Sequence, residues 1–219
     1  GLLDVVGVMG HLACADLPGH PANKAGRQAF LRGVDLAHRA GLRPRVRHLA
    51  ATAAALTDRR SHVDLIRVGA GLVGIDPSGT TALRPVLTLT APVVGVRRVP
   101  AGTGVGYGHT RHTDRTTHLG LLPVGYADGL PRSASGRAEV AVAGRRCPVI
   151  GTISMDQTVI DLGDLPVAPG TTATVFGTDP GAPSVAEWAR WSGTIAHEIV
   201  TGIGARVQRT AGHPETGRR

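Results

Sequence analysis

The stretch VDLIRVGAGLVGIDPSG, residues 63–79, divides the chain into two segments with different patterns. It starts as an apolar, β-rich run, closes on a turn at Gly69 and Gly71, and ends in the turn-forming sequence Asp-Pro-Ser-Gly. The residues before it alternate between strand and helix patterns, and those after it form short β-rich runs. We therefore expect two structural units joined by a linker over residues 75–85.

The first segment has the pattern of a parallel α/β architecture. The expected order is strand 2–10, helix 18–41, strand 45–50, helix 51–58 and strand 63–71. In such folds, functional sites lie at the carboxyl ends of the strands. His11, Thr52, Arg67 and Gly69 fall at or near these ends, and they are the first candidates for a site.

The second segment is predicted to be a mostly antiparallel, barrel-like β domain. Its β-rich runs are short and are separated by Gly, Pro and Asp turns. They cover residues 83–99, 117–127, 138–151, 153–163 and 172–177. A helical pattern returns only near the end of the chain, in SVAEWARWSG.

The composition is that of a basic globular protein. Hydrophobic residues make up 42% of the chain, charged residues 18%, and the net charge is +8. The charge is spread evenly, because residues 1–76 hold 10 basic and 6 acidic residues and residues 77–219 hold 14 and 10, which is +4 in each part. With aromatics at 3%, no stacking surface accompanies these cations, so we do not expect nucleic-acid binding.

The sequence predicts neither a membrane segment nor a signal peptide. No apolar run approaches the ~20 residues of a membrane span, and the chain begins almost at once in a strand-like run. Cys14 and Cys147 are far apart and have no metal-type spacing. We therefore expect reduced thiols, no metal site and a cytoplasmic location.

Several stretches in register resemble the alanine racemase family. They are GHLACADLPGHP (10–21), IRVGAGLVGIDPSG (66–79), LLPVGYADGLPR (121–132), VIGTISMDQTVID (149–161) and GTIAHEIVTGIGARVQR (193–209). The motif GYADG alone would be weak evidence. Its combination with SMDQ and with the barrel-like first segment, over nearly the whole chain, makes the resemblance specific.

The resemblance implies a fold and an activity. It implies that residues 1–78 are the C-terminal part of a (β/α)8 barrel that binds pyridoxal 5'-phosphate (PLP), that residues 79–211 form the racemase β domain, and that residues 212–219 are a disordered tail. The implied enzyme is an isomerase that interconverts L-alanine and D-alanine and supplies D-alanine for the cell wall. It is a homodimer whose active sites combine a barrel from one subunit with a tyrosine from the other.

The resemblance also implies roles for single residues. Tyr126 matches the base that exchanges the α-proton with the L-enantiomer. A phenol ordinarily ionises near pH ~10, so it needs a cationic or hydrogen-bonded neighbour, which the family supplies through residues that match His11 and Arg67. Arg67 would face the pyridine nitrogen and disfavour its protonation, which favours racemisation over other PLP chemistry. Met155 matches a position that meets the substrate from the partner subunit.

A phosphate site is implied by the loops after the second and third strands. Such sites in barrels use loop N–H groups and helix N-termini. The hydroxyl of Thr52 and the N–H groups of Gly69 and Ala70 are the expected donors. His197 stands where the family has a tyrosine on the phosphate side, and an imidazole can also donate a hydrogen bond.

The same residues have structural interpretations that the sequence leaves open. Tyr126 can be a strand-end tyrosine with a satisfied hydroxyl, and Met155 can be a core methionine. Arg67 can cap a helix or pair with Asp64. Thr52 can be the N-cap of its helix, because capping and phosphate binding use the same geometry.

The main departure from the family concerns its Schiff-base lysine. That lysine lies in the first barrel strand, upstream of every segment present here, and Lys24, in a predicted helix, is a poor replacement because an exposed amine is not activated. We therefore expect the chain to represent the C-terminal three-fifths of a racemase and to be inactive by itself. Strands without their barrel neighbours leave an open sheet edge and uncovered apolar faces.

Smaller departures lie around the expected cofactor site. Ala51–Thr52 replaces an Asn–Ser pair, Val68 replaces a proline, and Val73 replaces a tyrosine. Two other hypotheses therefore stay open beside the racemase. One is a non-catalytic remnant that retains a dimerising or binding surface, and the other is a basic β-barrel protein that binds nucleic acid.

Overall fold

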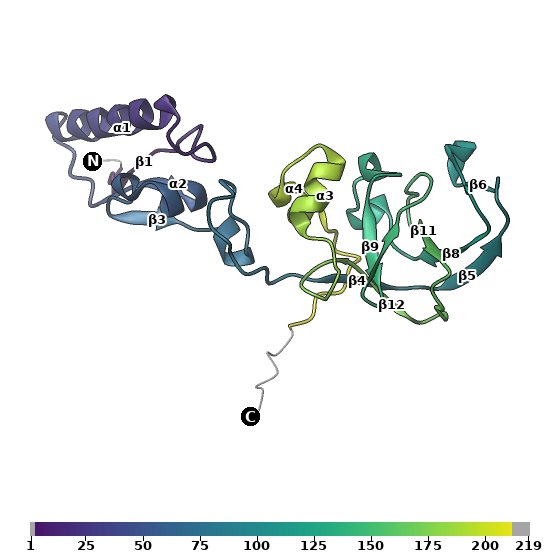
Figure 1. The fold of residues 1–219 in the computed structure, drawn as a ribbon. Helices are drawn as coiled ribbons and strands as arrows, with labels where there is room; N and C mark the ends of the chain where they lie inside the picture. Colours follow the sequence, from purple (N-terminus) through teal and green to yellow (C-terminus); the bar gives the residue numbers. More distant parts are fainter. Residues whose placement is uncertain (1–2, 212–219) are drawn as a thin grey trace, which may run out of the picture. The chain divides into compact units, whose positions relative to one another are not determined.

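A computed structural model describes residues 3–211 as two compact units that divide between Val86 and Leu87 (Figure 1). The first unit is α/β, and the second is built from antiparallel sheets. This architecture confirms the predicted fold class. The tail predicted at residues 212–219 lies outside the described residues.

The first unit is a parallel three-stranded sheet with helical connections. Its strand order is β1-β2-β3, formed by Gly7–Met9, Val46–Ala51 and Leu65–Arg67. The connecting and following elements are α1 (Pro21–Arg39), α2 (Thr52–Thr57), η1 (Arg59–Ser61) and η2 (Ala70–Val73). β1 is shorter than the predicted strand because its only partner, β2, begins opposite Gly7, at Val46.

Helix α1 begins at a capped N-terminus and packs against the core of this unit through its apolar face. The ring of His20 accepts a hydrogen bond from the N–H of Ala22 at the N-cap, and Pro21 occupies the first turn, where its missing N–H costs nothing. Phe30 and Val34, one turn apart, are buried against the core of the unit. In residues 3–211, no helix has both the length and the apolar character needed to cross a bilayer.

The two outer strands of this sheet expose apolar side chains. β1 and β3 are its edges, and Val6, Met9, Leu65 and Ile66 on or beside them are exposed. Exposed apolar side chains along an unpaired strand favour association with further strands. Open edges with exposed apolar side chains are what the sequence led us to expect of this sheet.

An ion pair fixes the register between β2 and β3. The carboxylate of Asp64 accepts hydrogen bonds from the backbone N–H of Arg47 at 2.8 Å and from its Nε and Nη2 atoms at 2.7 and 2.8 Å. These side-chain and backbone hydrogen bonds lower the pKa of Asp64 to about 2. The pairing of Asp64 with Arg67 that the sequence allowed is therefore wrong, because Arg47 on the neighbouring strand takes the carboxylate.

The second unit contains two antiparallel sheets and a hairpin. The sheet β10-β9-β12-β4 is formed by Arg145–Pro148, Glu139–Val142, Thr172–Phe176 and Leu89–Pro92. The sheet β11-β8-β5 is formed by Thr158–Gly163, Thr117–Leu122 and Gly95–Val99, and the hairpin by β6 (Gly104–Val105) and β7 (Arg111–His112). A bridge between Val149 and Ile160 links the two sheets, which gives the domain its barrel-like character.

Both sheets and a C-terminal helix share one core. Alternate residues of β11 point inward, so that Thr158, Ile160 and Leu162 are buried while the residues between them are not. Helix α3 (Val185–Ser192) begins with a reciprocal capping box between Ser184 and Glu187. It is followed by α4 (Ala196–Gly202).

Trp188 of α3 is the largest fully buried side chain of this core. It is 0% exposed, and its indole N–H donates to the carbonyl oxygen of Val175 in β12 at 2.6 Å. Trp191, three residues later, packs edge-on against it with ring centroids 5.9 Å apart but is only partly buried. Trp188 therefore attaches the helix to the sheet by packing and by a hydrogen bond.

We expect Trp188→Phe to lower the free energy of unfolding by about 2–4 kcal/mol, because it leaves the carbonyl of Val175 unpaired and opens a void. Trp191→Phe is the matched control, with an expected loss below about 1.5 kcal/mol. Urea unfolding followed by the fluorescence of the tryptophan that remains in each variant measures both, because both tryptophans lie in α3 of this unit. Equal losses for the two variants would contradict the role given to Trp188.

The low pKa of Asp64 predicts an acid-dependent loss of stability. Because this pKa is depressed in the folded chain, the carboxylate contributes stability above pH ~4, and this contribution is lost as the pH falls toward 2. Asp64→Asn should therefore lower the melting temperature at pH 5 and lose less on acidification to pH 2.5. The control is Asp35→Asn, an exposed carboxylate of α1. A parallel fall in the wild type and in Asp64→Asn would rule out this assignment.

Candidate active site

The side chain of Arg67, at the end of β3, reaches β2 and the segment that follows β1. Its Nη1 donates to Nδ1 of His48 at 2.8 Å, and its Nη2 to the carbonyl of Gly10 at 2.9 Å and to Nδ1 of His11 at 3.2 Å. A guanidinium can only donate, so both Nδ1 atoms must be acceptors. The two imidazoles therefore face the guanidinium through their Nδ1 atoms. The predicted residues His11 and Arg67 are in direct contact.

His48 is a site residue that the sequence analysis missed. It lies in the middle of β2, opposite Met9 on one side and Leu65 on the other. The sequence contained a weak local signal for His48, which is the polar residue of the run HLAA at the end of β2. Its contact with Arg67 depends on strand pairing, which the local sequence does not specify.

The start of α2 is tied to the turn that follows β3. Thr52 is buried, and its Oγ1 accepts a hydrogen bond from the N–H of Gly71 at 3.2 Å. The N-cap of α2 is Ala51, which makes no side-chain cap. The capping interpretation of Thr52 is therefore wrong, and its hydroxyl connects the two loops that the phosphate prediction combined.

These two loops form a small cradle with hydrogen-bond donors. Gly69 is the N-cap of η2 and Ala70 its first residue, so the N–H groups here precede the hydrogen bonding of the turn and are free for a ligand. A Cβ on Gly71 would lie 3.0 Å from Cγ1 of Val68 and 3.1 Å from Cγ2 of Thr52. Glycine thus permits the close approach of the loops, and neutral N–H and hydroxyl groups suit a phosphate group.

The GYADG and SMDQ motifs form a second cluster, in the β domain. Tyr126 begins the turn η4 (Tyr126–Asp128), where its N–H donates to the carbonyl of Ser154 at 3.0 Å. The next N–H, that of Ala127, donates to the carbonyl of Met155 at 2.9 Å. Tyr126 is 42% and Met155 54% exposed, so Met155 is not a core methionine. The two predicted residues share one surface.

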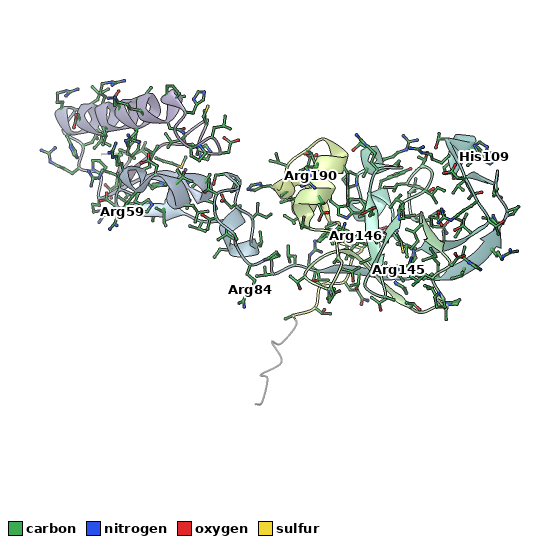
Figure 2. All side chains as sticks on the ribbon, in the orientation of Figure 1. Arg59, Arg84, His109, Arg145, Arg146 and Arg190 are labelled. Carbon is green, nitrogen blue, oxygen red and sulfur yellow. The ribbon has the colours of Figure 1, made fainter. Side chains whose placement is uncertain are left out.

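Tyr107 is a further candidate that the sequence analysis missed. It begins η3 (Tyr107–His109), which joins β6 to β7 and ends at the labelled His109 in Figure 2. Gly106 and Gly108 on either side have φ near +71°, and His109 has φ +44°, a conformation that is strained for a residue with a side chain. Tyr107 is 74% exposed. The sequence did contain a signal for this residue, because the only other tyrosine of the chain stands between two glycines.

Both tyrosine turns rest on the same segment of backbone. A Cβ on Gly106 would lie 3.1 Å from the backbone nitrogen of Thr152, and a Cβ on Gly125 would lie 2.3 Å from the carbonyl oxygen of Ser154. Residues 151–155, between β10 and β11, therefore support Tyr107 from one side and Tyr126 from the other. The remaining predicted residue, His197, lies partly buried in α4, and its role stays a prediction.

Comparison with known proteins identifies the family of this chain. The alanine racemase C-terminal domain family matches residues 86–211, and the alanine racemase N-terminal domain family matches residues 1–77. The chain belongs to the alanine racemase family. Its racemase C-terminal domain begins within one residue of the boundary between the two compact units.

Individual racemases match the chain closely but are longer. The alanine racemase of Thermobifida fusca is 49% identical over 95% of the chain and 57% of that protein. The structure of the Streptomyces coelicolor racemase is 48% identical, with a TM-score of 0.91 over 94% of the chain and 56% of the racemase. The Bartonella henselae racemase, described with covalently bound pyridoxal phosphate, is 32% identical, with a TM-score of 0.82 over 94% of the chain and 56% of the racemase. The chain thus spans somewhat more than half the length of these racemases.

The residues of the first unit fit part of a PLP site. The neutral cradle around Thr52 suits a phosphate group, and Arg67 at the strand ends suits a ring acceptor. Lys24, the only lysine of the chain, is exposed in α1. It lies beside His20, Asn23, Arg27 and Asp58 in a cavity of about 300 Å³ that does not include Arg67. The cradle and the arginine therefore fit the cofactor, whereas the position of Lys24 does not fit a Schiff-base lysine.

The fit of Gly125 against Ser154 predicts a strong effect of one added methyl group. Gly125→Ala should lower the free energy of unfolding by about 3 kcal/mol or more, because the new Cβ collides with backbone that cannot move aside. Gly95→Ala is the matched control in β5, where a Cβ meets nothing within 4 Å. Its effect should stay within about 1 kcal/mol. Thermal or urea unfolding of both variants measures the difference, and similar stabilities would contradict the contact.

Proposed function

We propose that this chain is part of a PLP-dependent alanine racemase that interconverts L-alanine and D-alanine and works as a homodimer. The observation that carries the proposal is the Arg67 cluster, in which the guanidinium donates to the Nδ1 atoms of His48 in β2 and of His11 after β1. The family membership and the cradle around Thr52 support it. D-alanine supply for the cell wall is the corresponding biological role.

Arg67 would set the chemistry of the cofactor. PLP, when bound, draws electron density from the α-carbon of an amino acid and so makes its proton exchangeable. A guanidinium facing the ring nitrogen would leave that nitrogen unprotonated and limit how far the charge spreads. Return of a proton to the α-carbon is then favoured over other outcomes. His11 and His48 hold the guanidinium in place with their Nδ1 atoms.

The phosphate group would be held by neutral donors. Thr52 and the N–H groups of Gly69 and Ala70 lie on two loops that are already joined by the hydrogen bond from Gly71. This connection would keep the cradle preformed, so that little ordering is required when the cofactor binds. His197 in α4 is proposed as a further donor because of the family position that it matches.

A tyrosine of the β domain would serve as the base on one face of the substrate. The sequence proposes Tyr126. Tyr107 is the second candidate, and its position favours it, because a base that acts in the partner subunit must project from its own surface. Tyr107 is the more exposed of the two, and its turn is held in a strained conformation. We therefore assign the proton exchange to Tyr107 and place Tyr126 beside Met155 on the wall of the same site.

The experiment joins the chain to the preceding barrel segment of the Thermobifida fusca racemase and measures conversion of L-alanine to D-alanine with PLP. The chimera should racemise, and the 219-residue chain alone should not exceed the rate of free PLP. An inactive chimera that still folds and dimerises would instead support the non-catalytic remnant.

Two tyrosine variants of the chimera separate the candidate bases. Tyr107→Phe should lower kcat by about 100-fold or more, the range expected for loss of a general base. Tyr126→Phe should keep kcat within about tenfold. The reverse result returns the role to Tyr126, and full activity in both variants excludes a phenol as the base.

A further inference from the structure

The segment that follows α4 packs directly on the turn that holds Tyr126. The N–H of Gly204 donates to the carbonyl of Asp128 at 2.9 Å. Gly129, at the end of the turn, has φ +109°, and a Cβ there would lie 2.2 Å from the carbonyl oxygen of Gly202. The backbones of these two segments are therefore in contact, although they are more than 70 residues apart in the sequence.

Arg206 extends this contact to the SMDQ turn. Its Nε lies 3.1 Å from Oδ1 of Asp128, and its Nη2 lies 2.7 Å from Oδ1 of Asp156. Asp156 follows Met155 directly in the sequence. The two carboxylates, Asp156 first and then Asp128, raise the pKa of Arg206 above its usual range. One guanidinium thus joins the two turns that present Tyr126 and Met155.

Asp128 is the buried partner in this bridge. Its side chain is only 7% exposed, and its other oxygen, Oδ2, accepts the N–H of Gly125 at 2.9 Å, which closes the Tyr126 turn. An exposed ion pair such as Arg206–Asp156 usually contributes little by itself. A buried carboxylate that loses its cation is left uncompensated, which is costly. The position of Asp128, and with it the turn, therefore depends on Arg206.

We propose that Arg206 is a positioning residue that holds the Tyr126 turn and the Met155 turn in one fixed arrangement. It acts through Asp128 and Asp156 and does not itself contact the substrate. The relevance of this arrangement to racemisation rests on the proposed function, but the geometric dependence does not. The two parts can therefore be tested separately.

The geometric part is tested by fluorine NMR on the 219-residue chain labelled with 3-fluorotyrosine. The chain has two tyrosines, so two signals are expected, and Tyr107→Phe and Tyr126→Phe assign them. Arg206→Lys keeps the charge but cannot bridge both carboxylates with a planar fork, and Arg206→Gln removes the charge. In both variants the Tyr126 signal should shift or broaden while the Tyr107 signal stays in place.

Two further variants keep this test decisive. Arg115→Lys alters another ion pair of the β domain, in which Nη2 of Arg115 lies 3.9 Å from Oδ2 of Asp161, and neither signal should move. Asp156→Asn removes the exposed part of the bridge and should shift the Tyr126 signal less than Arg206→Gln does. If the Arg206 variants do not fold, a shift of the Tyr126 signal alone in Asp156→Asn supports the proposal, and an unchanged Tyr126 signal contradicts it.

Two results would overturn the proposal. One is an unchanged Tyr126 signal in a folded Arg206→Gln chain, and the other is an equal movement of both tyrosine signals, which would indicate a general loosening of the domain. In an active chimera, Arg206→Lys should lower kcat about tenfold while the affinity for PLP is unchanged. An inactive chimera would count against the proposed function only, because the NMR result does not depend on activity.

Discussion

The backbone of residues 151–155 is the constraint on which the candidate surface of the β domain depends. Two turns from different parts of the chain approach it closely: a Cβ on Gly125 would collide with the carbonyl oxygen of Ser154, and a Cβ on Gly106 would be tightly packed against the nitrogen of Thr152. Backbone contacts of this kind leave no freedom for side-chain rearrangement. The two tyrosines of the chain are therefore presented from a rigid support, which suits the role proposed for them.

In the first unit, a side chain and not a backbone contact holds the candidate residues in place. The three strands of this unit are paired through their backbones, and the side chain of Arg67 adds hydrogen bonds from the end of β3 to the other two strands and their loops. The guanidinium requires acceptors around it, and the Nδ1 atoms of His11 and His48 supply them. The position of this cation therefore depends on the pairing of strands in a sheet whose edges are open.

The fold could be predicted because its pattern is local. Apolar spacing distinguishes the helix that becomes α1 from the alternating strands of the β domain, and Gly-Pro-Asp turns separate these strands. The position of strand ends in parallel α/β folds pointed to His11, Thr52, Arg67 and Gly69. The pairing of His11 with Arg67, and the addition of Ala70 to a phosphate site, came from the resemblance to the racemase family.

Apart from the N-cap of α2, the errors and omissions concern contacts between distant segments. His48 meets Arg67 across a strand pair, and Arg206 meets Asp128 from the far end of the chain. The sequence suggested a pair between Asp64 and Arg67 because the two residues are close in the chain, whereas the sheet places Arg47 beside Asp64. Tyr107 was overlooked because its motif is short and its support, residues 151–155, is formed only by the folded domain.

The placement of both tryptophans in α3 determines what spectroscopy can report on this molecule. Intrinsic fluorescence observes the β domain alone, whereas the longest helix, α1, with its large far-UV signal, belongs to the other unit. Melting curves recorded by the two methods thus monitor different halves of the polypeptide. Their coincidence or separation would reveal whether these halves lose structure in one cooperative step or independently.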